Sequence, residues 1–324
     1  MRVVMAECIT ASTEHIQRAA AALRAGKLVA FGTETVYGLG GDATNDHAVA
    51  SIFEAKGRPR FNPLISHVAD TETVFRHGMA SPLAEKLAHA FWPGPMTLVL
   101  TRIADCPVSP LALADLETIA LRVPANPLAR EFLKAAATPV AAPSANRSGR
   151  ISPSRAVHVM DDLGDSPHLA LVLDTGAATE GIESTVIDAR GERPVILRPG
   201  SITAADIEGM TGIAPLTHNA TNDAVISPGQ LKSHYAPRLP LRLNTSTAGP
   251  GTAFIGFGDT AQPDAGFHFN LSPDGDLIEA AAQLYHLLRA ADQCGAAEIA
   301  MAPIPDEAIG IAINDRLRRA AQRD

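Results

Sequence analysis

The sequence is poor in cysteine, in aromatic residues and in positive charge. Its three cysteines lie far apart without a Cys-x-x-Cys pair, namely Cys8, Cys106 and Cys294, which excludes a disulfide framework and a cysteine-rich zinc site. Lysine and arginine number 27 against 35 acidic residues, a net charge of −8, so a broad basic face that coats nucleic acid is not expected. Aromatic residues make up 4%, which argues against a platform for stacked bases.

Long apolar runs are also missing. None approaches the roughly 18 residues of a membrane span, and Glu7 interrupts the N-terminal segment before it reaches the length of a signal peptide. Together with the cysteine usage, this predicts a soluble protein of the reducing cytoplasm that does not bind membranes. Apolar residues as a class are plentiful, since 46% of the 324 residues are hydrophobic. A chain of this length can therefore bury a large core and form two domains.

Apolar runs and turn residues alternate along the chain in a pattern typical of α/β proteins. We expect helices over about residues 13–25, 46–56, 82–91, 127–137, 276–291 and 306–321, with Asp46 capping the second. We expect strands over about residues 28–31, 64–68, 96–100, 119–123, 169–174, 181–188, 194–198, 253–257 and 298–302.

The composition changes after residue 211. Residues 212–240 are rich in Asn, Thr, Ser, Pro and Gly and lack periodicity, so they are expected to connect a first domain, 1–211, with a small α/β domain, 241–324. Lys232, His234 and Tyr235 are unusual residues for a passive tether, however, and a long loop in a compact protein is often a lid. The sequence leaves a spacer and a lid equally open.

A dense basic loop stands out against the acidic background. The segment K-G-R-P-R-F-N-P-L-I-S-H, residues 56–67, carries Lys56, Arg58 and Arg60, with a glycine and a proline that forbid a regular helix between them. A rigid cationic loop of this kind suggests a local site for a small anion. The alternative is that the cations simply follow the end of a helix, where the helix dipole favours them. His67 alone would be more often structural than a ligand.

Two further loops carry hydroxyl groups and glycine. Residues 32–43, G-T-E-T-V-Y-G-L-G-G-D-A, are expected to form a glycine-rich loop, although they match neither a Walker A sequence nor a complete G-x-G-x-x-G fingerprint, and a tight strand-to-helix turn would explain them as well. Residues 140–153, V-A-A-P-S-A-N-R-S-G-R-I-S-P, supply donors suited to phosphate oxygens. Two such loops together favour a nucleotide or polyphosphate site.

Two arginines are placed where a charge needs an explanation. Arg122 lies inside an apolar strand and requires an anionic partner, either internal or bound, with an internal partner the more common case. Arg198 lies at the end of a strand in L-R-P-G, where a lone arginine is usually a solvated surface charge.

Taken together, five segments resemble a known family. The motifs K-G-R-P-x-F-N-P-L, P-S-A-N-x-S-G, E-S-T-V-I-D, L-R-P-G and S-P-G-x-x-x-x-H-Y-A-P, spread over residues 9–237, are similar to those of the YrdC-like threonylcarbamoyl-AMP synthases in their long form. The resemblance implies an α/β fold with a YrdC-like twisted open mixed sheet and helices, followed by a smaller C-terminal α/β (Rossmann-like) domain.

The resemblance also implies a nucleotidyltransferase reaction. L-Threonine, bicarbonate and ATP, the latter with Mg²⁺, would give L-threonylcarbamoyladenylate and pyrophosphate for the t6A37 modification of tRNA. The product would pass to tRNA threonylcarbamoyl-transfer proteins, and direct binding of tRNA stays open. The metal ligands cannot be assigned from the sequence.

Site residues follow from the matching motif positions. The resemblance assigns charge neutralisation in catalysis to Lys56 and Arg58. It assigns binding of ATP or the adenylate to Lys56, Arg58, Asn62, Thr118, Ser144, Ser152, Arg198 and Tyr235, and binding of threonine to Thr35, His67, Arg122, Ala142 and Ser184.

Two other functions compete with this one. A binder of double-stranded RNA could use a basic concave face, although the acidic total and the few aromatics count against it. A nucleotide-binding regulator without chemistry would use the same loops.

Overall fold

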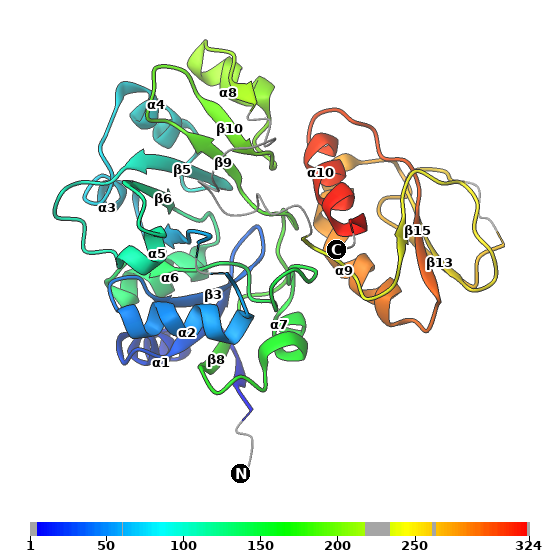
Figure 1. Cartoon of the computed structure of the whole chain (residues 1–324), viewed down its shortest axis with the longest axis horizontal. Coiled ribbons are helices and arrows are strands. Elements are labelled where there is room, and N and C mark those ends of the chain that lie inside the picture. Colours follow the sequence, from blue (N-terminus) through cyan, green and yellow to red (C-terminus); the bar gives the residue numbers. More distant parts are fainter. Residues whose placement is uncertain (1–4, 60, 218–233, 261–263, 323–324) are drawn as a thin grey trace.

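The computed structural model describes residues 5–59, 61–217, 234–260 and 264–322, which form two domains side by side (Figure 1). The larger domain is built on a sheet of eleven strands in the described chain. Their order is β1 (Glu7–Thr10), β8 (Leu169–Asp174), β2 (Leu28–Gly32), β3 (Tyr37–Asp42), β7 (Val140–Ala141), β4 (Ile65–His67), β6 (Thr118–Arg122), β5 (Met96–Thr101), β9 (Thr185–Asp188), β10 (Val195–Arg198) and β11 (Leu216–Thr217). The sheet contains both parallel and antiparallel pairs, which confirms the predicted mixed sheet.

Helices cover both faces of this sheet. They are α1 (Thr13–Arg24), α2 (Asp46–Lys56), α3 (Thr71–Val74), α4 (Pro82–Phe91), α5 (Pro110–Leu113), α6 (Pro127–Ala136), α7 (Ala156–Leu163) and α8 (Ala204–Thr211). Successive side chains of a strand point to opposite faces, so Val29 and Phe31 of β2 join the core beneath α1 and α6, whereas Leu28 and Ala30 join the core that includes α2 and α4. This two-sided burial explains the continuous apolar run in β2.

The glycine-rich segment forms a strand, contrary to the loop expected from its sequence. Residues 37–42 are β3, which pairs antiparallel with β2. A Cβ at Gly40 would lie 2.9 Å from Cγ1 of Val140 and 3.0 Å from the carbonyl oxygen of Val29. Glycine is therefore required here because neighbouring elements approach the strand closely, rather than because the backbone must turn.

The cap of α2 also differs from the expectation. The side chain of Asn45, not of Asp46, accepts the first backbone N–H groups, from His47 at 3.0 Å and from Ala48 at 3.2 Å. The carboxylate of Asp46 instead accepts the hydroxyl of Ser109. Both residue types cap helices well, and the tertiary contact decides between them.

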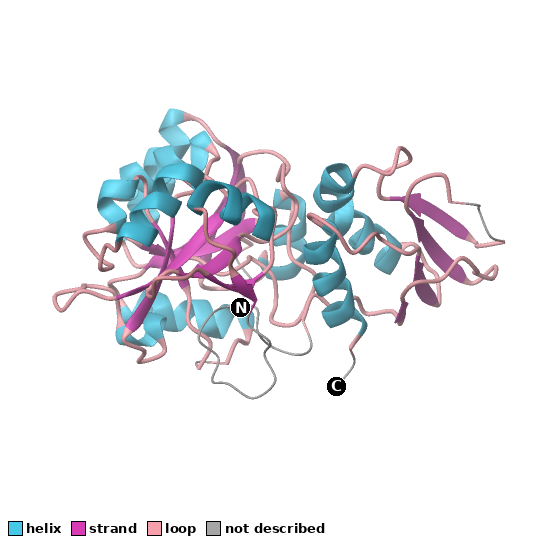
Figure 2. Ribbon diagram, turned by 90° about the horizontal axis from the view of Figure 1, so that it is seen from above, coloured by secondary structure: helices cyan, strands magenta, loops and turns pink. Residues whose placement is uncertain are grey.

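The smaller domain has a four-stranded, all-parallel sheet in the described residues, as the predicted Rossmann-like α/β domain requires. Its order is β12 (Leu241–Arg242), β15 (Glu298–Met301), β13 (Thr252–Gly256) and β14 (Phe267–Asn270). Helices α9 (Leu277–Gln293) and α10 (Gly310–Ala321) lie on the side of this sheet that faces the larger domain (Figures 1 and 2).

The segment expected to connect the domains is described only at its two ends. Strand β11 at its start pairs with β10 and extends the large sheet, and His234 and Tyr235 near its end are buried. Lys232 and most of the expected lid lie outside the described residues, as does Arg60. The predicted boundaries at 211 and 240 stay predictions. Among the helices of the described chain, none has the length and apolar character needed to cross a bilayer.

Candidate functional site

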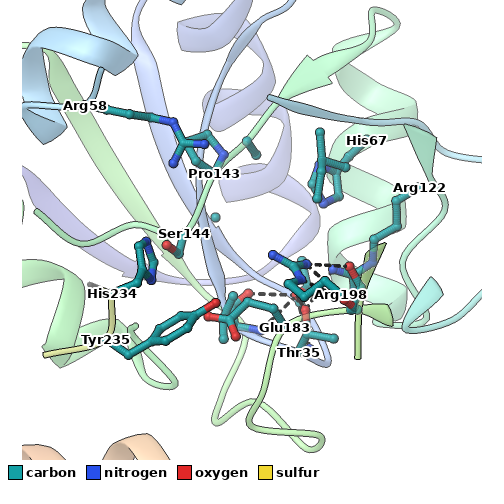
Figure 3. Close-up of a pocket in the computed structure, with 16 residues that line it drawn as sticks. Thr35, Arg58, His67, Arg122, Pro143, Ser144, Glu183, Arg198, His234 and Tyr235 are labelled. Carbon is teal, nitrogen blue, oxygen red and sulfur yellow. Dashed lines mark hydrogen bonds between the residues drawn. The ribbon is translucent and has the colours of Figure 1, made fainter. Parts of the chain in front are cut away.

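A pocket opens where loops from distant parts of the larger domain meet the end of the connecting segment (Figure 3). The loop between β2 and β3, strands β4 and β6, the loop after β7, the loop before β9 and the end of β10 all contribute to it. Its lining residues are Thr33, Thr35, Val36, Gly38, Arg58, Ile65, His67, Arg122, Ala142, Pro143, Ser144, Glu183, Ser184, Arg198, His234 and Tyr235.

Most of the residues predicted to bind substrate line this one pocket. The predicted threonine residues all do so, and so do four of the predicted nucleotide residues: Arg58, Ser144, Arg198 and Tyr235. Four predicted residues do not line it, namely Lys56, Asn62, Thr118 and Ser152. The structure thus brings together side chains from positions 35 to 235 of the chain, as a single site for both ligands requires.

Three arginines give the pocket its positive charge. Arg58, Arg122 and Arg198 are buried, and Figure 3 shows Arg58 and Arg122 approaching from opposite sides. Burial and the neighbouring Arg198 lower the pKa of Arg58 to about 10. Its Nε lacks a hydrogen-bond partner among the described residues. A buried cation of this kind is stabilised when an anion binds beside it.

Arg122 has an internal anionic partner, the case that its sequence favoured, but the sequence did not identify this partner as Glu34. Its guanidinium lies 2.5 Å from a carboxylate oxygen of Glu34 and donates to Oγ1 of Thr35 at 2.8 Å. The other oxygen of Glu34 accepts the backbone N–H groups of Ala125 and Asn126. Glu34 lies in the glycine-rich segment, residues 32–43. This segment therefore supplies the anionic partner that Arg122 was expected to need.

Lys56 lies behind the wall of the pocket. Its ammonium group donates to the carbonyl oxygens of Ser144 and Asn146, each at 2.5 Å. Burial and the nearby Arg58 hold its pKa well below the ordinary value. In this structure the lysine therefore fixes the loop that carries Ser144, and its catalytic role stays a prediction.

The other predicted nucleotide residues surround this region. Asn62 is fully buried, and both polar atoms of its side chain lack partners among the described residues. Ser152 donates to a carboxylate oxygen of Glu183 at 2.6 Å. Thr118 and Arg122 lie at opposite ends of β6 and share one face of that strand, because alternate residues point the same way.

His67 is neutral in this environment. Burial, followed by the nearby Arg122, lowers the pKa of its imidazole to about 3. The ring packs edge-on against Phe31, with centroids 6.1 Å apart, and Nδ1 has no hydrogen-bond partner among the described residues. A neutral imidazole can both accept and donate a hydrogen bond to a ligand hydroxyl or carboxylate.

Glu183 is the acidic residue of the pocket wall, and sequence reasoning assigned it no role. It is buried, and it accepts from Ser152 of its own domain and from Tyr285 and Arg316 of the smaller domain. The sequence held one signal for this contact. Arg316 lies on the apolar stripe of its helix, which also carries the buried residues Ile313, Leu317 and Ala320.

Fold and site together define a two-domain α/β protein with a buried, cationic pocket suited to a nucleotide and a small carboxylate. Comparisons with known proteins agree. Residues 21–200 match the Sua5/YciO/YrdC family, described as "Telomere recombination", and residues 202–322 match "Threonylcarbamoyl-AMP synthase, C-terminal domain". The chain belongs to the Sua5 family in its long form.

Individual relatives match over almost the full length. The threonylcarbamoyl-AMP synthase of Bacillus subtilis is 38% identical, with 97% of this chain and 94% of that protein covered. That of Pyrococcus abyssi is 38% identical, with 94% of each covered. The crystal structure of P. abyssi Sua5 complexed with L-threonine superimposes with a TM-score of 0.87 at 36% identity, covering 98% of this chain and 97% of that one.

Proposed function

We propose that this chain synthesises L-threonylcarbamoyladenylate from L-threonine, bicarbonate and ATP. The observation that carries the proposal is the convergence of Arg58, Arg122 and Arg198 on one pocket, together with the hydroxyls of Ser144 and Ser184. Family membership and the names of full-length relatives support the same reaction.

L-Threonine would bind at the end of the pocket formed by Thr35, His67, Arg122, Ala142 and Ser184. Arg122 has five N–H donors, of which three contact Glu34, Thr35 and Gly94, so it can also receive the substrate carboxylate. The L-threonine complex of the P. abyssi relative supports this choice of ligand.

The nucleotide would bind toward Arg58 and Ser144, with Arg198 beside the phosphates and Tyr235 closing the pocket wall. Asn62, Thr118 and Ser152 would contact the nucleotide from the margin of the pocket, and Lys56 would hold the loop of Ser144 against it. In this arrangement the positive charge of the pocket offsets the negative charge of the triphosphate.

The chemistry asks little proton transfer of the protein. The threonine amine takes up the carbon of bicarbonate, which gives a carbamate and water. A carbamate oxygen then bonds to the α-phosphorus of ATP as the bond to the bridging oxygen breaks and pyrophosphate leaves. Alignment of the two ligands and neutralisation of phosphate charge by Arg58 and Arg198 would provide the catalysis.

The described residues contain no cluster of three or more His, Cys, Asp or Glu side chains able to hold a metal. Glu183, the one carboxylate among the described residues of the pocket lining, already accepts from Ser152, Tyr285 and Arg316. We expect Mg²⁺ to enter on the phosphates of ATP, as is common for this ion, and no step above depends on it.

We place this activity in the cytoplasm, where tRNA threonylcarbamoyl-transfer proteins would collect the product for the t6A37 modification. The test is a pyrophosphate-release assay of the full chain with each substrate omitted in turn. Release that needs ATP, L-threonine and bicarbonate together supports the proposal. Release without threonine, or ATP binding without turnover, would instead indicate a hydrolase or a nucleotide-binding regulator.

A further inference from the structure

Arg316 of the smaller domain is a buried cation that the proposed reaction does not use directly. Only 1% of its side chain is exposed, although it belongs to α10, a helix outside the domain that carries the pocket. Its Nε lies 3.2 Å from Oε2 of Glu183. Its terminal nitrogens donate to the backbone carbonyl oxygens of Glu183, at 3.3 Å, and of Pro199, at 2.5 Å.

These contacts join two pocket segments that are distant in the sequence. Glu183 precedes Ser184, and Pro199 follows Arg198. Ser184 and Arg198 are themselves linked, because the guanidinium donates to the carbonyl oxygen of Ser184 at 3.0 and 3.1 Å. Arg316 of the smaller domain thus binds the backbone of both segments, at Glu183 and at Pro199.

Both domains donate hydrogen bonds to the carboxylate of Glu183. The hydroxyl of Tyr285, from α9, donates to Oε2 at 2.8 Å, and Ser152 donates to Oε1 at 2.6 Å. Burial by itself would raise the pKa of Glu183, but Arg316 and Arg198 hold it at about 2. Glu183 is therefore ionised at neutral pH, in the wall of a pocket that is proposed to bind the phosphates of ATP.

The carboxylate of Glu183 would repel a bound phosphate unless a cation outside the pocket lining neutralised it. Arg316 is such a cation. Besides Arg316, Arg198 is the cation that lowers the pKa of Glu183. Without Arg316, the carboxylate of Glu183 would leave uncompensated negative charge in the pocket wall and would repel the nucleotide phosphates, because a buried charge without a partner is strongly unfavourable.

We propose that Arg316 is a positioning residue through which the smaller domain neutralises Glu183 and holds the segments of Ser184 and Arg198 in place for the nucleotide. This inference rests on the proposed function for the identity of the ligand. It assigns the smaller domain a direct part in building the pocket, although that domain lines none of it among the described residues.

The test compares variants of the full chain by calorimetric binding of α,β-methylene-ATP, which cannot release pyrophosphate, and by steady-state kinetics. Arg316→Met is expected to weaken nucleotide binding and to raise KM for ATP at least about tenfold, with a smaller effect on kcat. Arg316→Lys should restore part of the loss. The double variant Glu183→Gln/Arg316→Met should recover binding to within about threefold of wild type, because no released carboxylate remains.

Ile255→Ala is the matched control for a loss of stability. Ile255 is buried in β13 of the same domain, and its apolar side chain cannot donate a hydrogen bond to Glu183, so this variant should lower the melting temperature without changing KM. Three results would overturn the inference. They are wild-type affinity for the analogue in a folded Arg316→Met protein, an equal loss of affinity in Ile255→Ala, and no recovery of affinity in the double variant. A wild-type chain that binds the analogue but releases no pyrophosphate would refute the proposed reaction while the binding series still decides on Arg316.

Discussion

Arg122 and Glu34 form a buried ion pair at the edge of the pocket, with the two side chains 4% and 6% exposed. The pair links β6 to the loop after β2, and the same carboxylate caps the backbone N–H groups of Ala125 and Asn126. Burial alone would raise the pKa of Glu34, but Arg122 brings it below the ordinary value. A threonine carboxylate at Arg122 would therefore meet a guanidinium that is already held in place.

Replacement of Glu34 by glutamine should damage both folding and threonine binding. It leaves Arg122 buried without a counter-charge, a change that typically costs about 3–5 kcal/mol. We expect a large fall in the free energy of unfolding, measured by urea denaturation, and weaker L-threonine binding by calorimetry. Glu7→Gln is the control, because the Arg18–Glu7 pair is about half exposed; equal effects of the two substitutions would contradict this account.

Substitution of Arg58 should separate catalysis from stability. Arg58→Ala removes a desolvated cation whose Nε lacks a partner in the described chain, so the melting temperature should hold while adenylate formation falls about 100-fold or more, as after the loss of one charge-stabilising donor. Lys56→Ala should lower activity to a similar degree, but it should also lower the melting temperature, since Lys56 anchors the carbonyl oxygens of Ser144 and Asn146.

Pyrophosphate release and thermal unfolding of the same preparations check both expectations. Arg76→Ala serves as the control, because that arginine is exposed and pairs with Glu72 at the surface. Wild-type turnover of Arg58→Ala would remove the basic loop from the mechanism.

The sequence could predict the regular elements and the members of the pocket because both depend on local signals. The helix Pro82–Phe91 and the strand Leu169–Asp174 have the predicted bounds, since a helix-stopping proline and a bounded apolar run mark them. Motifs placed Arg58 and Arg198 in one site although 140 positions separate them, because a motif carries the family's geometry with it.

The rest could not be predicted because it depends on contacts between distant segments. Half of strand β3 is glycine, a residue with little intrinsic preference for a strand, and the close approach of Val140 and Val29 explains the glycine at position 40. Glu183 looks like a solvated charge in the sequence, and Arg316 differs from one only by its place on the apolar stripe of α10. Their pairing depends on how the two domains pack, and no local pattern encodes that packing.

The packing of the two domains can itself be tested at Gly181. This residue has φ +70°, and a Cβ there would lie 2.4 Å from the carbonyl oxygen of Ala281 and 2.4 Å from Cα of Ala282, both in α9. Gly181→Ala should force the domains apart beside Glu183 and lower nucleotide affinity as well as stability.

Gly212→Ala provides the control for backbone strain. Gly212 has nearly the same φ, +73°, but a Cβ would meet nothing within 4 Å, so its substitution should cost only the left-handed strain of about 1 kcal/mol. Thermal unfolding and calorimetric binding of the nucleotide analogue distinguish the two variants. Equal losses in both would show that the interface tolerates the added methyl group.

The last prediction concerns acid. Burial and Arg122 lower the pKa of His67 to about 3 from an ordinary value of 6.5. Between these two values the unfolded chain binds a proton that the folded chain does not, so the free energy of unfolding rises with pH in this window and falls as the solution is acidified. From pH 7 to pH 5, His67 should account for a loss on the order of 2 kcal/mol.

His67→Gln should remove that part of the pH dependence, because glutamine does not titrate. Urea denaturation at pH 5 and pH 7 measures the difference for wild type and for the variant. His47→Gln, at an exposed position of α2, should keep the wild-type difference. If His67→Gln loses as much stability on acidification as the wild type, then the imidazole is protonated inside the folded pocket. The assignment of a neutral His67 would then be wrong.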